Sequence, residues 1–210
     1  MAYAKLLRGH TSEVNFALAA TVFAVIFFAE LPDKTMIATV VMGSRSSALP
    51  VWIGASMAFI VHMGIAAIAG HFLELLPHKV LEIIITVVFL AGAAYLLFVP
   101  EKSELAKGER EAEKESPGAF LKVAATAFAV IFIGEFGDLT QILAANFVAK
   151  SHNPWVVFVA ASLALIAVSA LGSFGGRSLV RVLPLARIRQ GGGILLAAFG
   201  IYTLITIFTG

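Results

Sequence analysis

Two short acidic motifs interrupt long apolar stretches of this 210-residue sequence. The first reads ELPDKT over residues 30–35, and the second reads EFGDLTQ over residues 135–141. Their carboxylates are those of Glu30, Asp33, Glu135 and Asp138. An ionisable side chain in the middle of a membrane span costs several kcal/mol by insertion scales. These four carboxylates must therefore face one another, a cation or water rather than lipid.

The composition of the motifs favours a hard divalent cation. In each motif the glutamate and the aspartate are three positions apart, a spacing that places both on one face of a helix. Oxygen ligands without sulfur or a histidine cluster suit Ca²⁺, Mn²⁺ or Mg²⁺ better than Zn²⁺ or Cu⁺. Pro32 removes a backbone donor and frees the carbonyl of Phe28, and Gly137 loosens the equivalent point. The predicted metal ligands are the four carboxylates with Thr35, Thr140 and Gln141.

The same four carboxylates are the predicted proton-coupling groups: Glu30, Glu135, Asp33 and Asp138. Carboxylates crowded in a low-dielectric site cannot all ionise together unless a cation is bound. Protons and metal then compete for the same oxygens, which is the minimum chemistry of a cation/proton antiporter. Lys34 is predicted to balance charge. A plain neutralising pair between Glu30 and Lys34, four residues apart, is the alternative, and it is weakened because Leu139 offers no such partner in the second motif.

Other polar residues within the apolar stretches have less specific interpretations. Ser56 and Ser162 occupy corresponding positions and are typical of helix packing, with a secondary cation contact as the alternative. His62 is interpreted as a packed polar residue rather than a proton relay. Asn146 and Thr39 are weak candidates for the site.

The elements that position the motifs are predicted to be transmembrane helices. The chain is 60% hydrophobic and 13% charged, which excludes a soluble globular domain, a disordered chain and a nucleic-acid binder. It contains no cysteine, which excludes zinc–thiolate and iron–sulfur sites. We expect an all-α polytopic membrane protein with six spans, at about residues 14–42, 49–73, 80–99, 120–148, 154–180 and 188–208.

The two halves of the chain resemble each other. AATVFAVIF at 19–27 matches AATAFAVIF at 124–132 at all but one position, and the motif carboxylates follow at the same offset of 105 residues. We expect a first three-helix repeat over 1–100, a charged linker over 101–119 and a second repeat over 120–210. Three spans per half invert the second repeat relative to the first, as in many secondary transporters with a midplane site.

The distribution of Lys and Arg predicts the orientation. Four of these residues fall on one side of the predicted membrane and ten on the other, which carries the central linker. The positive-inside rule then places the linker in the cytoplasm and both termini outside. The expected location is the inner (plasma) membrane.

At the two motifs the sequence resembles the GDT1 family, also called uncharacterised protein family 0016. The family hallmark is two copies of Glu-x-Gly-Asp-Lys/Arg-Ser/Thr on the first and fourth of six core helices. The resemblance covers about residues 14–208, with Pro32 in place of the first Gly and Leu139 in place of the second Lys/Arg. It implies exchange of Mn²⁺ and Ca²⁺ for protons at the four carboxylates, and manganese export in small bacterial members.

The expected function is therefore secondary-active export of Mn²⁺, with Ca²⁺ as a second candidate, in exchange for protons. No enzymatic activity, cofactor or nucleic-acid partner is expected, and the oligomeric state is not predicted. Two alternatives stay open: an exporter of a small organic cation such as a basic amino acid, and a passive cation channel. A channel needs weak binding at several sites along a pore, whereas these carboxylates are concentrated at one level.

Overall fold

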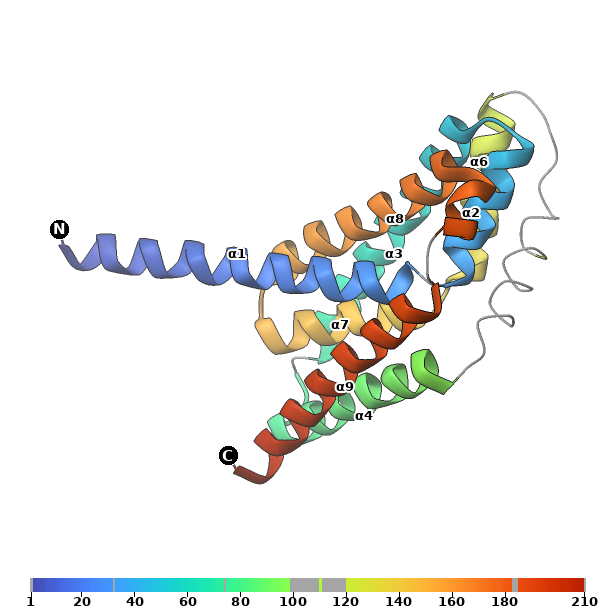
Figure 1. The fold of residues 1–210 in the computed structure, drawn as a ribbon. Helices are drawn as coiled ribbons and strands as arrows, with labels where there is room; N and C mark the ends of the chain where they lie inside the picture. Colours follow the sequence, from blue (N-terminus) through green and yellow to red (C-terminus); the bar gives the residue numbers. More distant parts are fainter. Residues whose placement is uncertain are drawn as a thin grey trace.

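The computed structural model describes residues 2–31, 33–73, 75–98, 110, 120–182 and 185–209. These residues form eight helices and no strand, so the predicted all-helical class is confirmed for them (Figure 1). The helices are α1 (Ala2–Glu30), α2 (Lys34–Arg45), α3 (Ala48–Leu73), α4 (His78–Phe98), α6 (Phe120–Gly134), α7 (Leu139–Ser151), α8 (Pro154–Val182) and α9 (Leu185–Thr209). The predicted kink at Pro32 and the linker at 101–119, apart from Arg110, lie outside the described residues.

Four helices are long and apolar enough to cross a membrane, and two bent helix pairs raise this number to as many as six if each pair is one span. The pairs correspond to the predicted spans 14–42 and 120–148. Each consists of two helices, bent by 69° between α1 and α2 and by 71° between α6 and α7. The acidic motifs occupy both breaks, at the points where Pro32 and Gly137 are expected to interrupt helical bonding.

The first helix also begins earlier than its apolar pattern predicts, at Ala2 instead of residue 14. The early residues include Ala, Lys, Leu and Arg, which favour helix formation without being apolar throughout. Hydropathy locates the part of a helix that matches lipid, and helix propensity extends the helix beyond it. In Figure 1 the start of α1 projects from the bundle, on the same side as the C-terminus.

The helix contacts pair the two halves of the chain. α3 packs against α6 and α7 of the second half, and α8 packs against α1 and α2 of the first half. α3 also packs on α8, and α4 lies beside α9 (Figure 1). The buried core therefore lies largely between the two halves. Side chains such as Ile26, Phe59 and Leu143 are buried in it.

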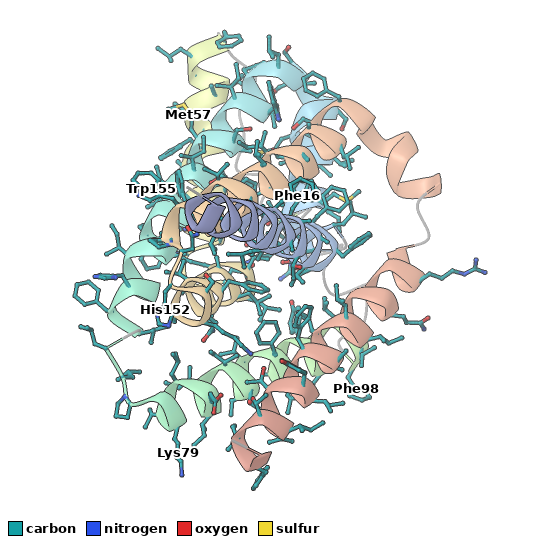
Figure 2. All side chains as sticks on the ribbon, turned by 90° about the vertical axis from the view of Figure 1, so that its left-hand side faces the viewer. Phe16, Met57, Lys79, Phe98, His152 and Trp155 are labelled. Atoms are coloured by element: carbon teal, nitrogen blue, oxygen red, sulfur yellow. The ribbon has the colours of Figure 1, made fainter. Side chains whose placement is uncertain are left out.

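The outer surface of the bundle is apolar. Phe16, Met57, Phe98 and Trp155, labelled in Figure 2, expose 77%, 56%, 81% and 76% of their surfaces. Large apolar side chains exposed on all sides are unfavourable in water and match the surroundings of a membrane span.

A glycine sets the closest approach between α3 and α6. A Cβ atom on Gly54 would lie 2.1 Å from the carbonyl oxygen of Ala124, a contact with rigid backbone that no side-chain rotation relieves. A Cβ on Gly64 of the same helix would instead meet a Phe158 ring carbon at 3.9 Å, an ordinary van der Waals distance.

We predict that Gly54→Ala forces α3 away from α6 and destabilises the protein by about 1–3 kcal/mol, the usual effect of overpacking a close-packed interior. Gly64→Ala is the matched control and should leave stability near that of the wild type. Thermal unfolding of the detergent-solubilised protein measures both. Equal midpoints for the two variants would contradict the close packing at Gly54.

Candidate cation site

Both motifs form the same turn between two helices. Glu30 is the last residue of α1, and the backbone N–H of Asp33 donates to its carbonyl oxygen at 2.9 Å. In the second half the N–H of Asp138 donates to the carbonyl of Glu135 at 3.1 Å. The three-residue spacing thus brings each glutamate and aspartate together across a turn, not along the face of one continuous helix as the sequence suggests.

The four carboxylates meet at one point. Each of Glu30, Asp33, Glu135 and Asp138 offers an oxygen within 4.8 Å of the others. The exposed fraction of the residue is 0% for Glu30, 7% for Asp33 and 3% for Glu135, and Asp138 is half-buried. Oxygens about 2.3–2.6 Å from one Ca²⁺ ion are at most about 4.6–5.2 Å apart. The cluster therefore has the dimensions of a single divalent cation site.

Several carboxylate oxygens of the cluster have no hydrogen-bond donor of their own. The Oε2 atom of Glu135 is buried without a hydrogen-bond partner. Both side-chain oxygens of Glu30 are buried beside the hydroxyls of Thr35 and Thr140, without a hydrogen bond of good geometry. A buried ionised carboxylate is strongly unfavourable unless it is paired or coordinates a metal. These oxygens therefore require a bound cation or a proton.

The helix ends around the cluster include two N-termini, which present backbone N–H groups, and two C-termini, which present backbone carbonyl groups. Asp33 and Asp138 are the N-cap residues of α2 and α7, in extended backbone conformations, and neither side chain caps its own helix. The positive ends of these two helix dipoles therefore favour the negative cluster. The C-terminal ends of α1 and α6 supply carbonyl groups that helical bonding leaves unsatisfied. Transporters with broken helices use such carbonyls to coordinate cations.

Two side chains of the first motif reach into the second half. The Thr35 hydroxyl donates to Oε1 of Glu135. The Lys34 ammonium lies 3.7 Å from the same oxygen and donates a hydrogen bond of 2.7 Å to the carbonyl of Gly134. Gly134 ends α6, so Lys34 both balances the charge of Glu135 and satisfies a free helix carbonyl. The charge-balancing role predicted for Lys34 thus connects the two halves.

The second motif repeats these contacts only in part. Leu139, at the position that corresponds to Lys34, packs against Gly92 of α4 beside Leu196 of α9. The Thr140 hydroxyl interacts with Glu30 of the first motif, and it also makes a long contact, 3.4 Å, with Oδ2 of Asp138. The site therefore has similar turns in both halves but an asymmetric set of supporting side chains.

Gln141 holds the turn of the second motif. Its amide oxygen accepts a 2.7 Å hydrogen bond from the N–H of Gly137, whose φ of 75° is readily available only to glycine. Its amide nitrogen lies 3.4 Å from the carbonyl oxygen of His62. The predicted metal ligand Gln141 is thus placed at the site with its amide bonded to the backbone of the break.

His62 is a supporting residue whose role the sequence does not reveal. Its Nε2 lies 3.1 Å from the carbonyl oxygen of Phe132, and its ring stacks on that of Phe132 with centroids 4.8 Å apart. His62 is 1% exposed and contacts both sides of the α6–α7 break. A histidine in an apolar span is visible in the sequence, but its partners across the bundle are not.

The remaining polar candidates either bond within their own helices or are buried without a hydrogen-bond partner. Thr39 donates to the carbonyl of Met36 in its own helix, and Asn146 donates to that of Ile142. The hydroxyls of Ser56 and Ser162 are buried without a hydrogen-bond partner.

The helical bundle and its buried carboxylate cluster define a class: multi-pass membrane proteins with an acidic cluster inside the bundle. Comparison with known proteins gives the family. The profile described as "Divalent cation/proton antiporter GDT1" matches residues 18–104 and 123–210, so the chain belongs to the GDT1 family. This family is one of exchangers rather than enzymes.

Two curated relatives are similar along most of the chain. "Protein PAM71, chloroplastic" of Arabidopsis thaliana is 26% identical over 90% of this chain and 57% of its own length. The chain thus spans a little over half of that relative. "GDT1-like protein C17G8.08c" of Schizosaccharomyces pombe is 26% identical over 91% of this chain and 84% of its own length. No solved structure matches the chain.

We predict that His62→Phe loosens the second break, because the ring still fits beside Phe132 but no longer donates to its carbonyl. A buried acceptor left unsatisfied costs about 1–3 kcal/mol. Hydrogen–deuterium exchange of the segment 132–141 should therefore become faster. His71→Phe, near the exposed end of α3, is the control. Unchanged protection in His62→Phe would show that this hydrogen bond does not hold the break.

Proposed function

We propose that the protein is a secondary-active antiporter that exports Mn²⁺, and also Ca²⁺, from the cytoplasm in exchange for protons. The observation that carries this proposal is the cluster of four carboxylates within 4.8 Å of one another. Its size, its oxygen ligands and its burial suit one desolvated divalent cation. Membership of a divalent cation/proton antiporter family supports the same chemistry.

In this proposal the cation and the protons compete for the same atoms. Glu30, Asp33, Glu135 and Asp138 bind the metal when they are ionised and hold protons when the metal leaves. Four adjacent negative charges repel one another too strongly to persist without either partner. Supporting groups orient and balance the cluster: Thr35, Thr140, Gln141 and Lys34.

We further propose six spans in two inverted repeats, residues 1–100 and 120–210, joined by the linker at 101–119. The exchanged packing supports this arrangement, because α3 packs on α6 and α7 just as α8 packs on α1 and α2. The nearly equal bends of 69° and 71° support it as well. Rocking of one repeat against the other would expose the site alternately to each side.

The choice of Mn²⁺, the export direction and the inner-membrane location belong to the proposal as well. Oxygen ligands alone accept Mn²⁺ and Ca²⁺ alike, so the preference comes from the family resemblance. The excess of Lys and Arg on the linker side supports a cytoplasmic linker and external termini.

We predict that Glu30→Gln and Glu135→Gln each reduce cation-driven proton movement by at least tenfold, because each removes a charge and a shared metal and proton ligand. Lys122→Gln, at the exposed start of α6 away from the cluster, is the control. Proteoliposomes with an internal pH dye measure exchange with Mn²⁺, Ca²⁺, Mg²⁺ and lysine. Undiminished exchange in both variants would refute the role of the cluster, and proton movement with lysine alone would favour an organic-cation exporter.

We also predict that Mn²⁺ stabilises the folded protein. A ligand present at 100 times its dissociation constant adds about 2.7 kcal/mol to the free energy of unfolding. The thermal midpoint in detergent should therefore rise with Mn²⁺ in the wild type and in Lys122→Gln but not in the Glu30→Gln/Glu135→Gln double variant. An equal rise in all three proteins would place the bound metal elsewhere.

A further inference from the structure

A second polar feature lies away from the carboxylates, in a cavity of about 240 Å³ between α1, α4, α7 and α9. Its lining includes six residues with polar side chains: Thr21, Asn146, Lys150, Ser151, Tyr202 and Thr203. It is large enough for several water molecules, each of which occupies about 30 Å³ in the liquid. Figure 2 views the molecule from this side, with His152 at the end of α7, α1 above it and the α4–α9 pair below.

The exposed lining of all three described cavities is mainly apolar, and they differ in size and in the residues around them. Those of about 480 and 600 Å³ lie along α8, beside α3 and beside α1 respectively, and their linings share Trp155 and are otherwise almost entirely apolar. Such grooves match lipid chains. The cavity at Asn146 is smaller and has polar groups contributed by α1, α7 and α9.

Asn146 has an unsatisfied oxygen that is buried next to this cavity. The residue is 1% exposed, and its amide nitrogen donates to the carbonyl of Ile142 at 2.8 Å. The amide oxygen Oδ1 is buried and has no hydrogen-bond partner. A buried carbonyl oxygen without a donor costs about 1–3 kcal/mol. Water or a cation in the cavity would satisfy it.

The cavity lies along the same two helical segments as the carboxylates. Asn146 follows Asp138 by eight residues on α7, and Thr21 precedes Glu30 by nine residues on α1. At 1.5 Å per residue these separations are about 12 and 14 Å along the helices. None of the four carboxylates lines the cavity. It therefore approaches the cluster to within two or three helical turns and stops short of it.

Lys150 places a positive charge in the cavity wall. Its ammonium donates to the Thr203 hydroxyl at 3.3 Å and lies 5.3 Å from the centre of the Tyr202 ring. Both partners belong to α9, so these contacts hold the charge against that wall. Glu82 of α4 interacts electrostatically with Lys150. The two charges together therefore set the electrostatic barrier to a cation that approaches from outside the bundle.

We propose that this cavity is the vestibule through which the cation and protons pass between the carboxylate cluster and the membrane face at which α7 ends. This inference rests on the proposed exchange function. The Asn146 amide oxygen is a ligand for a cation that passes inward beyond Ser151 at the end of α7, and Lys150 lowers the rate of cation entry there. The positions that correspond to them, 105 residues earlier, are the buried Val41 and the exposed Arg45.

Accessibility of an introduced thiol tests the vestibule. Because the sequence contains no native cysteine, the reagent can react only with the introduced thiol. In oriented proteoliposomes a membrane-impermeant methanethiosulfonate, added on the side of the chain termini, should modify Asn146→Cys and leave the matched control Val41→Cys unmodified. Modification should reduce Mn²⁺-driven proton movement at least fivefold. Thr21→Cys replaces Asn146→Cys if the latter fails to fold.

Two results would overturn the vestibule: a folded Asn146→Cys or Thr21→Cys that resists the reagent, and a modified protein with undiminished exchange. Modification is measured independently of transport. Wild-type protein that moves no protons with any divalent cation would refute the proposed function, whereas unmodified cysteine variants in an active protein refute the vestibule alone.

The charge of Lys150 is tested separately by cation entry from the same side. Lys150→Gln should lower the half-saturating Mn²⁺ concentration on the side of the termini severalfold, because it removes the repulsion. Arg45→Gln, at the corresponding exposed position, should leave that value unchanged. Equal half-saturation in Lys150→Gln and wild type would contradict the role given to Lys150.

Discussion

Mutual repulsion among four carboxylates within 4.8 Å of one another constrains the whole molecule. Inside an apolar bundle this repulsion is screened weakly, and it must be offset by a cation, by protons or by fixed positive groups. The protein supplies only part of the compensation, through the Lys34 ammonium, the Thr35 hydroxyl and the N-terminal ends of α2 and α7. A site left undercompensated in this way depends on an exchangeable positive partner.

The breaks in the helices follow from the same constraint. A continuous helix satisfies its own carbonyl and N–H groups and leaves none for a cation. Ending α1 and α6 at the motifs releases carbonyls and turns two helix N-termini towards the acidic cluster. Exposed backbone of this kind is tolerated at membrane depth only where protein or water surrounds it. The packing of α3 on α6 and α7, and of α8 on α1 and α2, provides that protein surrounding.

The two halves share a backbone plan but not a set of side chains. Both use the same turn, from the aspartate N–H to the glutamate carbonyl. Lys34 and Thr35 reach across from the first half, while Gln141 and His62 hold the second break. Much of this asymmetry is visible in the sequence as Lys34 against Leu139. The structural consequence of this difference is not visible in the sequence, because Lys34 bonds to Gly134, a hundred residues away.

The sequence by itself determined the helical class, the family, the two motifs and the four acids, because burial of charge is so costly that acids in apolar stretches are nearly always functional. Hydropathy did not predict the bends of 69° and 71° or the start of α1 at Ala2. It indicates which residues are apolar enough to lie in lipid, but it carries no information on backbone direction or on helix that extends beyond the lipid. Only the tertiary structure decided which groups meet: the partners of Lys34 and His62, the bonded amide of Gln141 and the cavity at Asn146. These contacts join helices far apart in the chain, and neither spacing nor periodicity along one segment specifies such distances.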